Sequence, residues 1–403
     1  MKLVKSTPEA KKAKSTSASQ WVYDKKTLTG AEIVIQALVD NGVDTIFAYP
    51  GGAVLPIYDA IFQQKKIKHV LVRHEQAALH AAEGYARSTG KVGCALVTSG
   101  PGATNAVTGL TDALLDSIPV LCFSGQVPTF LIGTDAFQEA DTTGITRQCT
   151  KQNYLVKDVK DLARTVHEAF HVAKSGRPGP VLIDLPKDVQ FAPGPYQSPE
   201  ETDLSRYCPR TMPDISLIEE AVEMMAHAKK PVFYTGGGVV NSGTEAAELL
   251  TEFVQMTGFP ITSTLMGLGG YPMRDKQHLG MLGMHGTFEA NWAMHDCDVM
   301  INIGARFDDR VTGRLDAFAP NSKKIHIDID PSSINKNVRV ELGIVADSVE
   351  ALRAMIAVWK KRKYKADAAA MKAWWAQIEK WRAVKCLNYK KSDQTIKPQY
   401  ALE

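Results

Sequence analysis

The sequence lacks several features that would each indicate a particular class of protein. No apolar stretch is long enough to cross a bilayer or to form the hydrophobic region of a signal peptide. The six cysteines are widely scattered, with no C-x-x-C pair and no zinc-site spacing, which indicates reduced thiols and no structural metal. The net charge is only +3, which gives no general electrostatic reason to bind nucleic acid or a membrane. We therefore expect a cytoplasmic protein whose partners are small molecules and other protein chains.

Residues 1–27 are rich in Lys, Ser, Thr and Ala. A transit peptide would normally carry arginine and avoid acids, whereas this stretch has no Arg and contains Glu9 and Asp24. The composition predicts a disordered cytosolic leader.

The rest of the chain is too long for one ordinary domain. From Leu28, short apolar runs that end in Gly or Pro alternate with amphipathic segments, which predicts a parallel sheet with crossover helices over residues 28–190. A Pro- and Ser-rich linker follows at 191–212, and the same alternation restarts over 213–350. The sequence thus predicts an α/β protein with two consecutive doubly wound parallel-sheet domains.

Residues 351–403 are basic and helical in pattern. This stretch contains Trp359, Trp374, Trp375 and Trp381, whose spacing could form a packing stripe. A core or interface role is therefore favoured over a cofactor role. Pro398 stands where a helix commonly opens, yet only five residues follow it. We expect that the sequence is cut off inside an element.

One carboxylate, Glu75, stands out in the segment LVRHEQAALHAAEGYAR. If the apolar run KHVLV is a strand and a helix begins near Glu75, this side chain lies at the carboxyl end of a parallel strand, where open α/β sheets bind ligands. A carboxyl group that shares a proton there would be useful in catalysis. The alternative is that Glu75 merely stabilises a helix N-terminus through the macrodipole.

Two glycine turns, AYPGGA at 48–53 and TSGPGATN at 98–105, are expected on the same edge of the sheet as Glu75. Glycine allows a ligand to approach the backbone closely. Each turn alone could equally be a tight strand-to-helix connection, so their order along the chain around Glu75 is the stronger indication.

These motifs, with GQVPTFLIGTDAFQEAD and SGRPGPVLIDLPKDV after them, resemble the pyrimidine-binding domain of the acetohydroxyacid synthase (acetolactate synthase) catalytic subunit family. The resemblance implies that Glu75 is the catalytic acid that hydrogen-bonds the aminopyrimidine of thiamine diphosphate. In that family the contact promotes the imino tautomer that removes the thiazolium C2 proton, and the resulting ylide attacks pyruvate. Other residues implied to bind thiamine diphosphate are Tyr49, Pro50, Gly51, Gly52, Pro101, Asn105 and Gln138. Phe137 and Lys187 resemble substrate-channel residues, although Lys187 alone would be interpreted as a solvated loop lysine.

The second domain resembles the FAD-binding central domain of the same family. Its TGGGVV turn lacks the full G-x-G-x-x-G fingerprint and is a weak signal alone. Arg177, Arg306 and Arg310 can neutralise a diphosphate, and Asp328 and Asp347 can accept ribose or adenine hydrogen bonds. A surface salt-bridge network is the alternative for the GARFDDR cluster. The remaining residues implied to bind FAD are Gly236, Gly237, Gly238, Thr264, Leu265, Met266, Gly283, Met284, His285, Gly286, Gly304, Asp308 and Ile329.

The chain departs from the family in one respect, because no Gly-Asp-Gly occurs in it. In the family this motif, with a later Asn, holds the Mg²⁺ that binds the cofactor diphosphate, so the metal ligands are expected in a missing C-terminal domain. The two halves of each family site also come from different subunits. We therefore expect a C-terminally truncated copy that is inactive alone.

The function implied for the full-length protein is condensation of two pyruvates to 2-acetolactate, or of pyruvate with 2-oxobutyrate to 2-aceto-2-hydroxybutyrate, in branched-chain amino-acid biosynthesis. A homodimer or homotetramer and a small regulatory subunit are the implied partners. The alternatives are a non-catalytic FAD-binding module, or a related pyruvate oxidase or carboligase. Glu75 argues against glyoxylate carboligase, which lacks the catalytic Glu, and GQVPTFLIGTDAFQE fits the synthase better than the oxidase.

Overall fold

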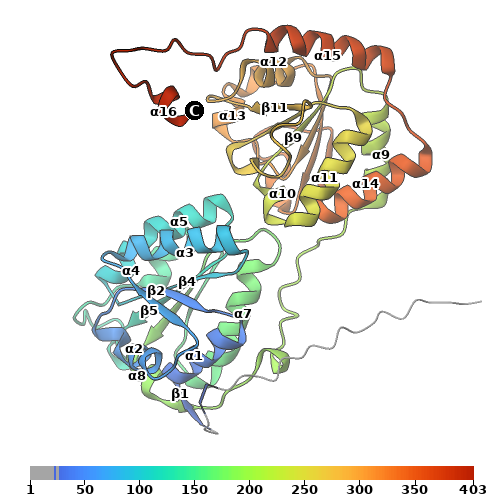
Figure 1. The fold of residues 1–403 in the computed structure, drawn as a ribbon. Coiled ribbons are helices and arrows are strands. Elements are labelled where there is room, and N and C mark those ends of the chain that lie inside the picture. Colours follow the sequence, from blue (N-terminus) through green and yellow to red (C-terminus); the bar gives the residue numbers. More distant parts are fainter. Residues whose placement is uncertain (1–21, 24–26) are drawn as a thin grey trace, which may run out of the picture. The chain divides into compact units, whose positions relative to one another are not determined.

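A computed structural model describes residues 22–23 and 27–403 (Figure 1). It divides into two compact units, the first made of residues up to Lys174 together with Gly179–Arg206, and the second of Ser175–Pro178 together with Tyr207–Glu403. The division at 206/207 falls within the Pro- and Ser-rich stretch 191–212.

Most of the predicted leader, residues 1–27, lies outside the described residues, but Val22, Tyr23 and Thr27 are described. The Val22 amide donates to Gln36 Oε1 at 2.8 Å, and the Tyr23 hydroxyl donates to the Ala60 carbonyl at 3.1 Å. Tyr23 is buried. These contacts hold Val22 and Tyr23 against the first unit, within the range for which a disordered leader was predicted, and the burial of the Tyr23 ring leaves its hydroxyl hydrogen-bonded.

The first unit is built on a six-stranded parallel sheet in the order β3-β2-β4-β5-β7-β6. Its central strands β4, β5 and β7 are buried along their whole length, as expected for a parallel sheet covered on both faces. The strands are β2 (Thr45–Ala48), β3 (Lys68–Leu71), β4 (Gly93–Val97), β5 (Val120–Gln126), β6 (Gln152–Leu155) and β7 (Val181–Pro186). Strands β1 (Leu28–Thr29) and β8 (Pro193–Gly194) form a separate two-stranded antiparallel sheet, which pairs the start of this unit with the segment after α8 (Lys187–Phe191).

Helices cover both faces of this sheet, with the pair α3 and α5 on one face and the pair α1 and α7 on the other (Figure 1). Alanines at 78, 82 and 86 give α3 a narrow face that packs closely against β4. The helices are α1 (Gly30–Asp40), η1 (Gly52–Val54), α2 (Leu55–Phe62), α3 (Glu75–Thr89), α4 (Pro101–Asn105), α5 (Val107–Asp116), η2 (Thr129–Leu131), α6 (Thr142–Thr146), η3 (Val159–Asp161), α7 (Leu162–Lys174), α8 (Lys187–Phe191) and η4 (Pro199–Glu201).

The second unit contains its own six-stranded parallel sheet, in the order β11-β10-β9-β12-β13-β14. The strands are β9 (Pro231–Thr235), β10 (Ile261–Ser263), β11 (His278–Met281), β12 (Val299–Ile303), β13 (Lys323–Asp328) and β14 (Leu342–Val345). The predicted fold class, two consecutive doubly wound parallel sheets, is confirmed.

Helices α9, α11 and α14 lie together on one side of this sheet, and α12 and α15 lie together on the other (Figure 1). Trp359 and Trp374 are buried in the core, and Trp375 and Trp381 pack against its edge, which agrees with the predicted packing stripe. The helices are α9 (Ile215–Ala226), α10 (Gly237–Asn241), α11 (Thr244–Thr257), η5 (Leu265–Gly267), α12 (Phe288–Asp296), α13 (Asp309–Thr312), η6 (Leu315–Ala317), η7 (Pro331–Ser333), α14 (Ser348–Arg362), α15 (Ala368–Arg382) and α16 (Pro398–Leu402).

Each sheet has a point at which the chain reverses its direction of winding. In the first sheet it lies between β2 and β4, and in the second between β9 and β12. Open parallel sheets bind ligands at the carboxyl ends of the strands that flank such a point. The turns after β2, β4, β9 and β12 are therefore where a site is expected. In the described part of the chain, no helix has both the length and the apolar character needed to span a bilayer.

Candidate functional site

The candidate site of the first unit lies at the carboxyl ends of β2 and β4, between which the winding reverses. Tyr49 and Pro50 follow β2, and Pro101 opens α4 after β4. The two turns touch: a Cβ at Gly51 would lie 2.4 Å from Thr98 Cβ, and the Ala53 amide donates to Thr98 Oγ1 at 3.4 Å. Thr98, a residue that the sequence interpretation did not include, thus holds the two glycine turns together.

Glu75 is the first residue of α3 and is buried, with 7% of its surface exposed. Its carboxylate does not cap its own helix, because the His74 side chain accepts the hydrogen bond from the Gln76 amide. Asn105, at the end of α4, instead donates its side-chain amide to Glu75 Oε2 at 3.0 Å. The carboxylate is therefore oriented by a residue from the second glycine turn.

The other Glu75 oxygen faces a bare stretch of backbone. A Cβ at Gly102 would lie 3.5 Å from Glu75 Oε1, and this oxygen has no hydrogen-bond partner within the described residues. A flat, uncharged ring with nitrogen donors would suit such a place, since it could approach the glycine backbone and bond the free oxygen.

Gln138 reaches this place through the loop that follows β5. Its backbone has φ 59°, and its carbonyl lies where a Cβ at Gly100 would stand, at 2.6 Å. Gly100 itself has φ 54°. Any side chain at Gly100 would push the Gln138 loop away, so the glycine is required for this contact.

Both ends of the Gln138 loop are hydrogen-bonded to the sheet or to α8. At one end the Thr129 amide donates to Asp188 Oδ1 at 2.9 Å, next to Lys187 at the start of α8. At the other end Gln126 Nε2 donates to the Ala140 carbonyl at 2.8 Å. Phe137, in the same loop, is 88% exposed.

Behind the loop lies a buried polar group that the sequence interpretation missed. Asp184 on β7 accepts hydrogen bonds from Ser124 Oγ at 2.7 Å and Gln126 Nε2 at 2.9 Å. Burial raises the pKa of Asp184 to about 7. An acidic residue inside the apolar run VLIDLP was the available signal, because a carboxyl group in a central strand needs hydrogen-bond partners.

In the second unit, the predicted FAD residues Gly236–Gly238, Thr264–Met266 and Gly304 lie just after β9, β10 and β12. The Gly238 amide donates to the Gly304 carbonyl at 3.0 Å, and the Thr264 amide donates to the Thr235 carbonyl at 2.9 Å. A Cβ at Gly236 would lie 2.3 Å from Gly304 O. Gly236, Gly238 and Gly304 therefore let the turns after β9 and β12 pack backbone against backbone. On the adjoining turn, Gly283 has φ 91°, and the Met284 amide donates to the Arg310 carbonyl at 2.8 Å.

Apolar side chains beside these turns are exposed. Leu265 is 68% exposed and Met284 is 64% exposed. The nearest atoms to a Cβ built at Gly237 belong to Met266, at 3.2 Å or more. Residues His285 and Gly286 continue the same turn as Met284. This apolar surface beside a glycine turn fits a flat heteroaromatic ring, so the residues present are compatible with FAD.

The charged residues of this unit already have protein partners. Arg306 pairs with Asp308 at 2.8 Å and Arg177 with Asp330 at 3.3 Å, while Arg310 is 3.8 Å from Asp309. The exposed pairs of Arg306 and Arg310 have the form of the salt-bridge network considered as the alternative. A phosphate would have to replace these carboxylates or join them.

The acidic residues at the ends of β13 and β14 differ from each other. Asp328 accepts from the Asp330 amide at 2.8 Å, with Ile329 between them, and keeps its other oxygen 3.6 Å from His326 Nε2. Asp347 caps α14 through the Val349 amide at 2.8 Å and also accepts from Ser242 Oγ at 3.0 Å. Both Asp347 oxygens are thus engaged, which leaves Asp328 as the better acceptor for a ligand.

Comparisons with known proteins place both units in one family. The family described as "Thiamine pyrophosphate enzyme, N-terminal TPP binding domain" matches residues 28–145, and "Thiamine pyrophosphate enzyme, central domain" matches residues 218–355. The chain is 50% identical over 381 residues to the acetolactate synthase large subunit of Haemophilus influenzae, covering 94% of this chain and 66% of that protein.

Two further relatives are similar to the same extent. Acetolactate synthase isozyme 3 large subunit of Escherichia coli is 48% identical over 93% of this chain and 66% of its own length. Acetolactate synthase of Mycobacterium bovis is 50% identical over 93% of this chain and 60% of its own length. The chain thus spans less than two thirds of the length of these relatives. It belongs to the thiamine pyrophosphate enzyme family and is homologous to acetolactate synthase large subunits.

Proposed function

We propose that this chain forms the pyrimidine-binding and FAD-binding parts of an acetolactate synthase large subunit. The reaction would be the condensation of two pyruvates to 2-acetolactate, or of pyruvate with 2-oxobutyrate to 2-aceto-2-hydroxybutyrate. The observation that carries the proposal is the buried Glu75 carboxylate, which Asn105 orients while its second oxygen faces the Gly102 backbone.

Glu75 would hold and move a proton at one ring nitrogen of thiamine diphosphate. Asn105 donates to Oε2, so Oε1 is the oxygen that remains for the ring. When bound, the cofactor supplies the nucleophilic carbon that attacks the first 2-oxo acid. Gly52 and Gly102 would leave room for the ring, Gly51 lets its turn approach Thr98, and Tyr49, Pro50 and Pro101 would line the ring.

The Gln138 loop would close over the substrate. Because Gly100 lets the Gln138 backbone approach the second glycine turn, this loop stands at the same strand ends as Glu75. We propose that the exposed Phe137 and the half-buried Lys187 line the path of the 2-oxo acid. Phe137 would exclude water and Lys187 would attract the substrate carboxylate.

FAD would bind at the turns of the second unit, with its ring over Leu265 and Met284 and its diphosphate near Arg306 and Arg310. Mg²⁺ would bind the diphosphate of thiamine diphosphate through residues outside these 403. We further propose a cytoplasmic location, self-association as a dimer or tetramer, and a small regulatory subunit, in keeping with the family resemblance. Nothing in the charge of the chain favours nucleic acid or membrane partners.

The test is acetolactate formation from pyruvate by a polypeptide in which this chain continues into the C-terminal part of the Haemophilus influenzae relative. Activity that requires thiamine diphosphate and Mg²⁺ is expected, together with a loss of about 10²–10⁴-fold in Glu75→Gln. Glu289→Gln is the control, because Glu289 lies in the second unit. Normal FAD binding with no activity would favour the non-catalytic module instead, and full activity of Glu75→Gln would contradict the proposed role of Glu75.

A further inference from the structure

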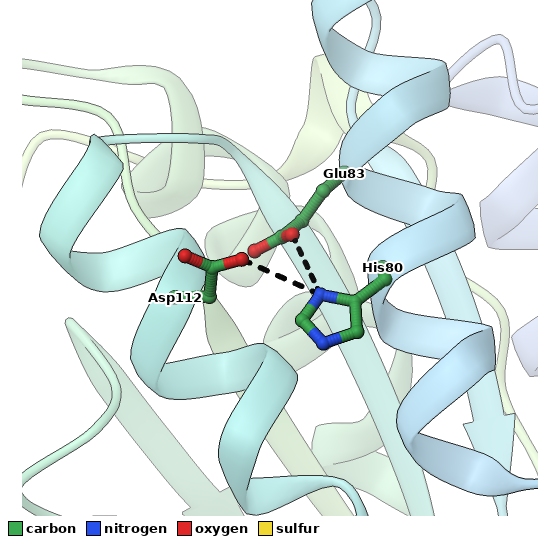
Figure 2. Close-up of side chains that lie close together, drawn as sticks. All are labelled: His80, Glu83 and Asp112. Atoms are coloured by element: carbon green, nitrogen blue, oxygen red, sulfur yellow. Dashed lines mark hydrogen bonds and ion pairs between the residues drawn. The ribbon is translucent and has the colours of Figure 1, made fainter. Parts of the chain in front are cut away.

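Three metal-ligating side chains meet on the outer side of the first unit. His80 and Glu83 are neighbours on one face of α3, and Asp112 approaches them from α5 (Figure 2). His80 Nδ1 lies 3.1 Å from Glu83 Oε2 and 3.4 Å from Asp112 Oδ2. One ligand atom from each residue can be chosen so that all three lie within 4.8 Å of one another. The sequence interpretation assigned no role to Glu83 or Asp112.

Glu83 is the residue that needs explanation. Its side chain is only 5% exposed, and its Oε1 atom is buried without a hydrogen-bond partner. Figure 2 shows the Glu83 carboxyl group pointing into the space between His80 and Asp112. A buried acceptor without a partner carries a desolvation cost. A cation bound between the three side chains would remove this cost.

The local charges also favour a cation. Within the described residues, neither Glu83 nor Asp112 forms an ion pair with a lysine or arginine. Asp116, one turn further along α5, forms an ion pair with Arg87 at 2.6 Å. Glu83 and Asp112 therefore differ from this neighbouring carboxylate in having no arginine or lysine partner among the described residues.

The spacing and donor types suit a metal ion. Ligand atoms bound to one ion at about 2.0–2.2 Å are separated by roughly 3–3.5 Å. The distances from His80 Nδ1 to Glu83 Oε2 and to Asp112 Oδ2, 3.1 Å and 3.4 Å, fall in that range. An imidazole nitrogen favours a first-row transition metal over Mg²⁺ or Ca²⁺, which prefer oxygen ligands alone.

We propose that His80 Nδ1, Glu83 and Asp112 bind one divalent transition-metal ion of the Mn²⁺ or Zn²⁺ type. His80 and Asp112 are 39% and 49% exposed, so water can reach the ion and complete its coordination. His80 Nε2 would then carry the ring proton. The Gln76 side-chain amide, whose Nε2 lies 3.4 Å away, would orient the imidazole by turning its Oε1 toward the ring to accept that proton. The site is separate from the proposed Mg²⁺ site and does not depend on the proposed function.

The test is a titration of the 403-residue chain with Mn²⁺ in the absence of thiamine diphosphate and Mg²⁺. Binding is measured as the decrease in the electron paramagnetic resonance signal of free Mn²⁺. We expect one saturable site per chain that Zn²⁺ displaces, since Zn²⁺ binds such donors more tightly. His80→Gln and Asp112→Asn should each weaken Mn²⁺ binding at least about tenfold. Both positions are partly exposed, so these variants should fold, which circular dichroism verifies.

Asp116→Asn is the matched control, because it removes one carboxylate from the same helix without touching the cluster. Unchanged binding in Asp116→Asn, together with losses in both His80→Gln and Asp112→Asn, supports the site. No saturable Mn²⁺ site in the parent chain would overturn the proposal. So would binding that survives in either of those two variants, or an equal loss in all three.

Discussion

Asp184 is a carboxyl group in the middle of the first sheet, and within the described residues it has no cationic partner. Its pKa is about 7, raised by burial above the ordinary value of 3.8. The native state therefore binds a proton that the unfolded chain releases between about pH 4 and pH 7. Stability is thus greater at low pH and is lost as the pH rises through this window.

Replacing Asp184 with Asn should remove this dependence. The Asn side chain can accept from Gln126 and donate to Ser124 Oγ, so both hydrogen bonds of the network are kept. We expect Asp184→Asn to protect β5 and β7 from hydrogen exchange more than the parent at pH 8, by about tenfold or more, and to equal it at pH 4. Mass spectrometry of peptides from these strands measures the ratio. A ratio that does not change with pH would contradict a pKa near 7 for Asp184.

Among elements, α15 shows how a helix late in the sequence completes the core of the second unit. Trp374 is 2% exposed, and its Nε1 donates to the Pro231 carbonyl at 3.1 Å. Trp375 is only partly buried, although its Nε1 donates to the Gly258 carbonyl at 3.0 Å. The two neighbouring tryptophans thus make similar hydrogen bonds but differ in burial.

This pair allows burial to be tested separately from hydrogen bonding. Trp374→Ala should destabilise the second unit by about 3–5 kcal/mol, because it leaves a large cavity. Trp375→Ala should cost clearly less. Urea unfolding followed by tryptophan fluorescence reports this unit, since five of the six tryptophans lie in it. Equal losses in the two variants would mean that α15 is held by its hydrogen bonds and not by the burial of Trp374.

The elements also show what the sequence could and could not predict. Uninterrupted apolar runs such as VGCALV and PVLCFSG, and the periodic helices, were predicted because their patterns are strong. Strands β6 and β11 were missed, since QNYL and HLGM are four residues long and neither alternate nor form an apolar run. The segment after β7 was expected to be a loop but forms the short helix α8.

The candidate site was predictable in its parts but not in its contacts. The order of the glycine turns around Glu75 indicated one sheet edge, and the motifs indicated the family. The Asn105–Glu75 hydrogen bond, the Gly100–Gln138 approach and the role of Thr98 depend on three loops meeting. Contacts between loops that are far apart in the sequence cannot be predicted from the spacing of residues along the chain. The glycines at 236, 238 and 304 serve first to pack backbone against backbone, which the sequence pattern did not indicate.

At the scale of the whole molecule, the two units have separate cores and separate candidate sites. If FAD binds only the second unit, it should stabilise that unit alone. At 100 times its dissociation constant, a ligand adds about 2.7 kcal/mol. We expect FAD to raise the urea midpoint seen by tryptophan fluorescence while leaving hydrogen exchange in β5 and β7 unchanged.

Arg306→Ala should weaken this FAD effect, whereas Arg314→Ala should not. Arg314 is also paired with a nearby aspartate, Asp316 at 2.8 Å, but is 79% exposed, so it is a control of equal charge. If FAD does not raise the urea midpoint of the parent chain, the proposed flavin site is contradicted. If both variants weaken the FAD effect equally, Arg306 acts only through its positive charge and not through a direct contact with the diphosphate.

Both sheets gather their candidate ligand-binding groups at the carboxyl ends of the strands, which leaves the opposite edge free for protein engineering. The turn at Gly90 and Lys91 lies there, just before β4. It is exposed, and a Cβ at Gly90 would meet no atom within 4 Å. A fluorophore or an affinity tag inserted in this turn would report on the first unit while Glu75 and its glycine turns stay as they are.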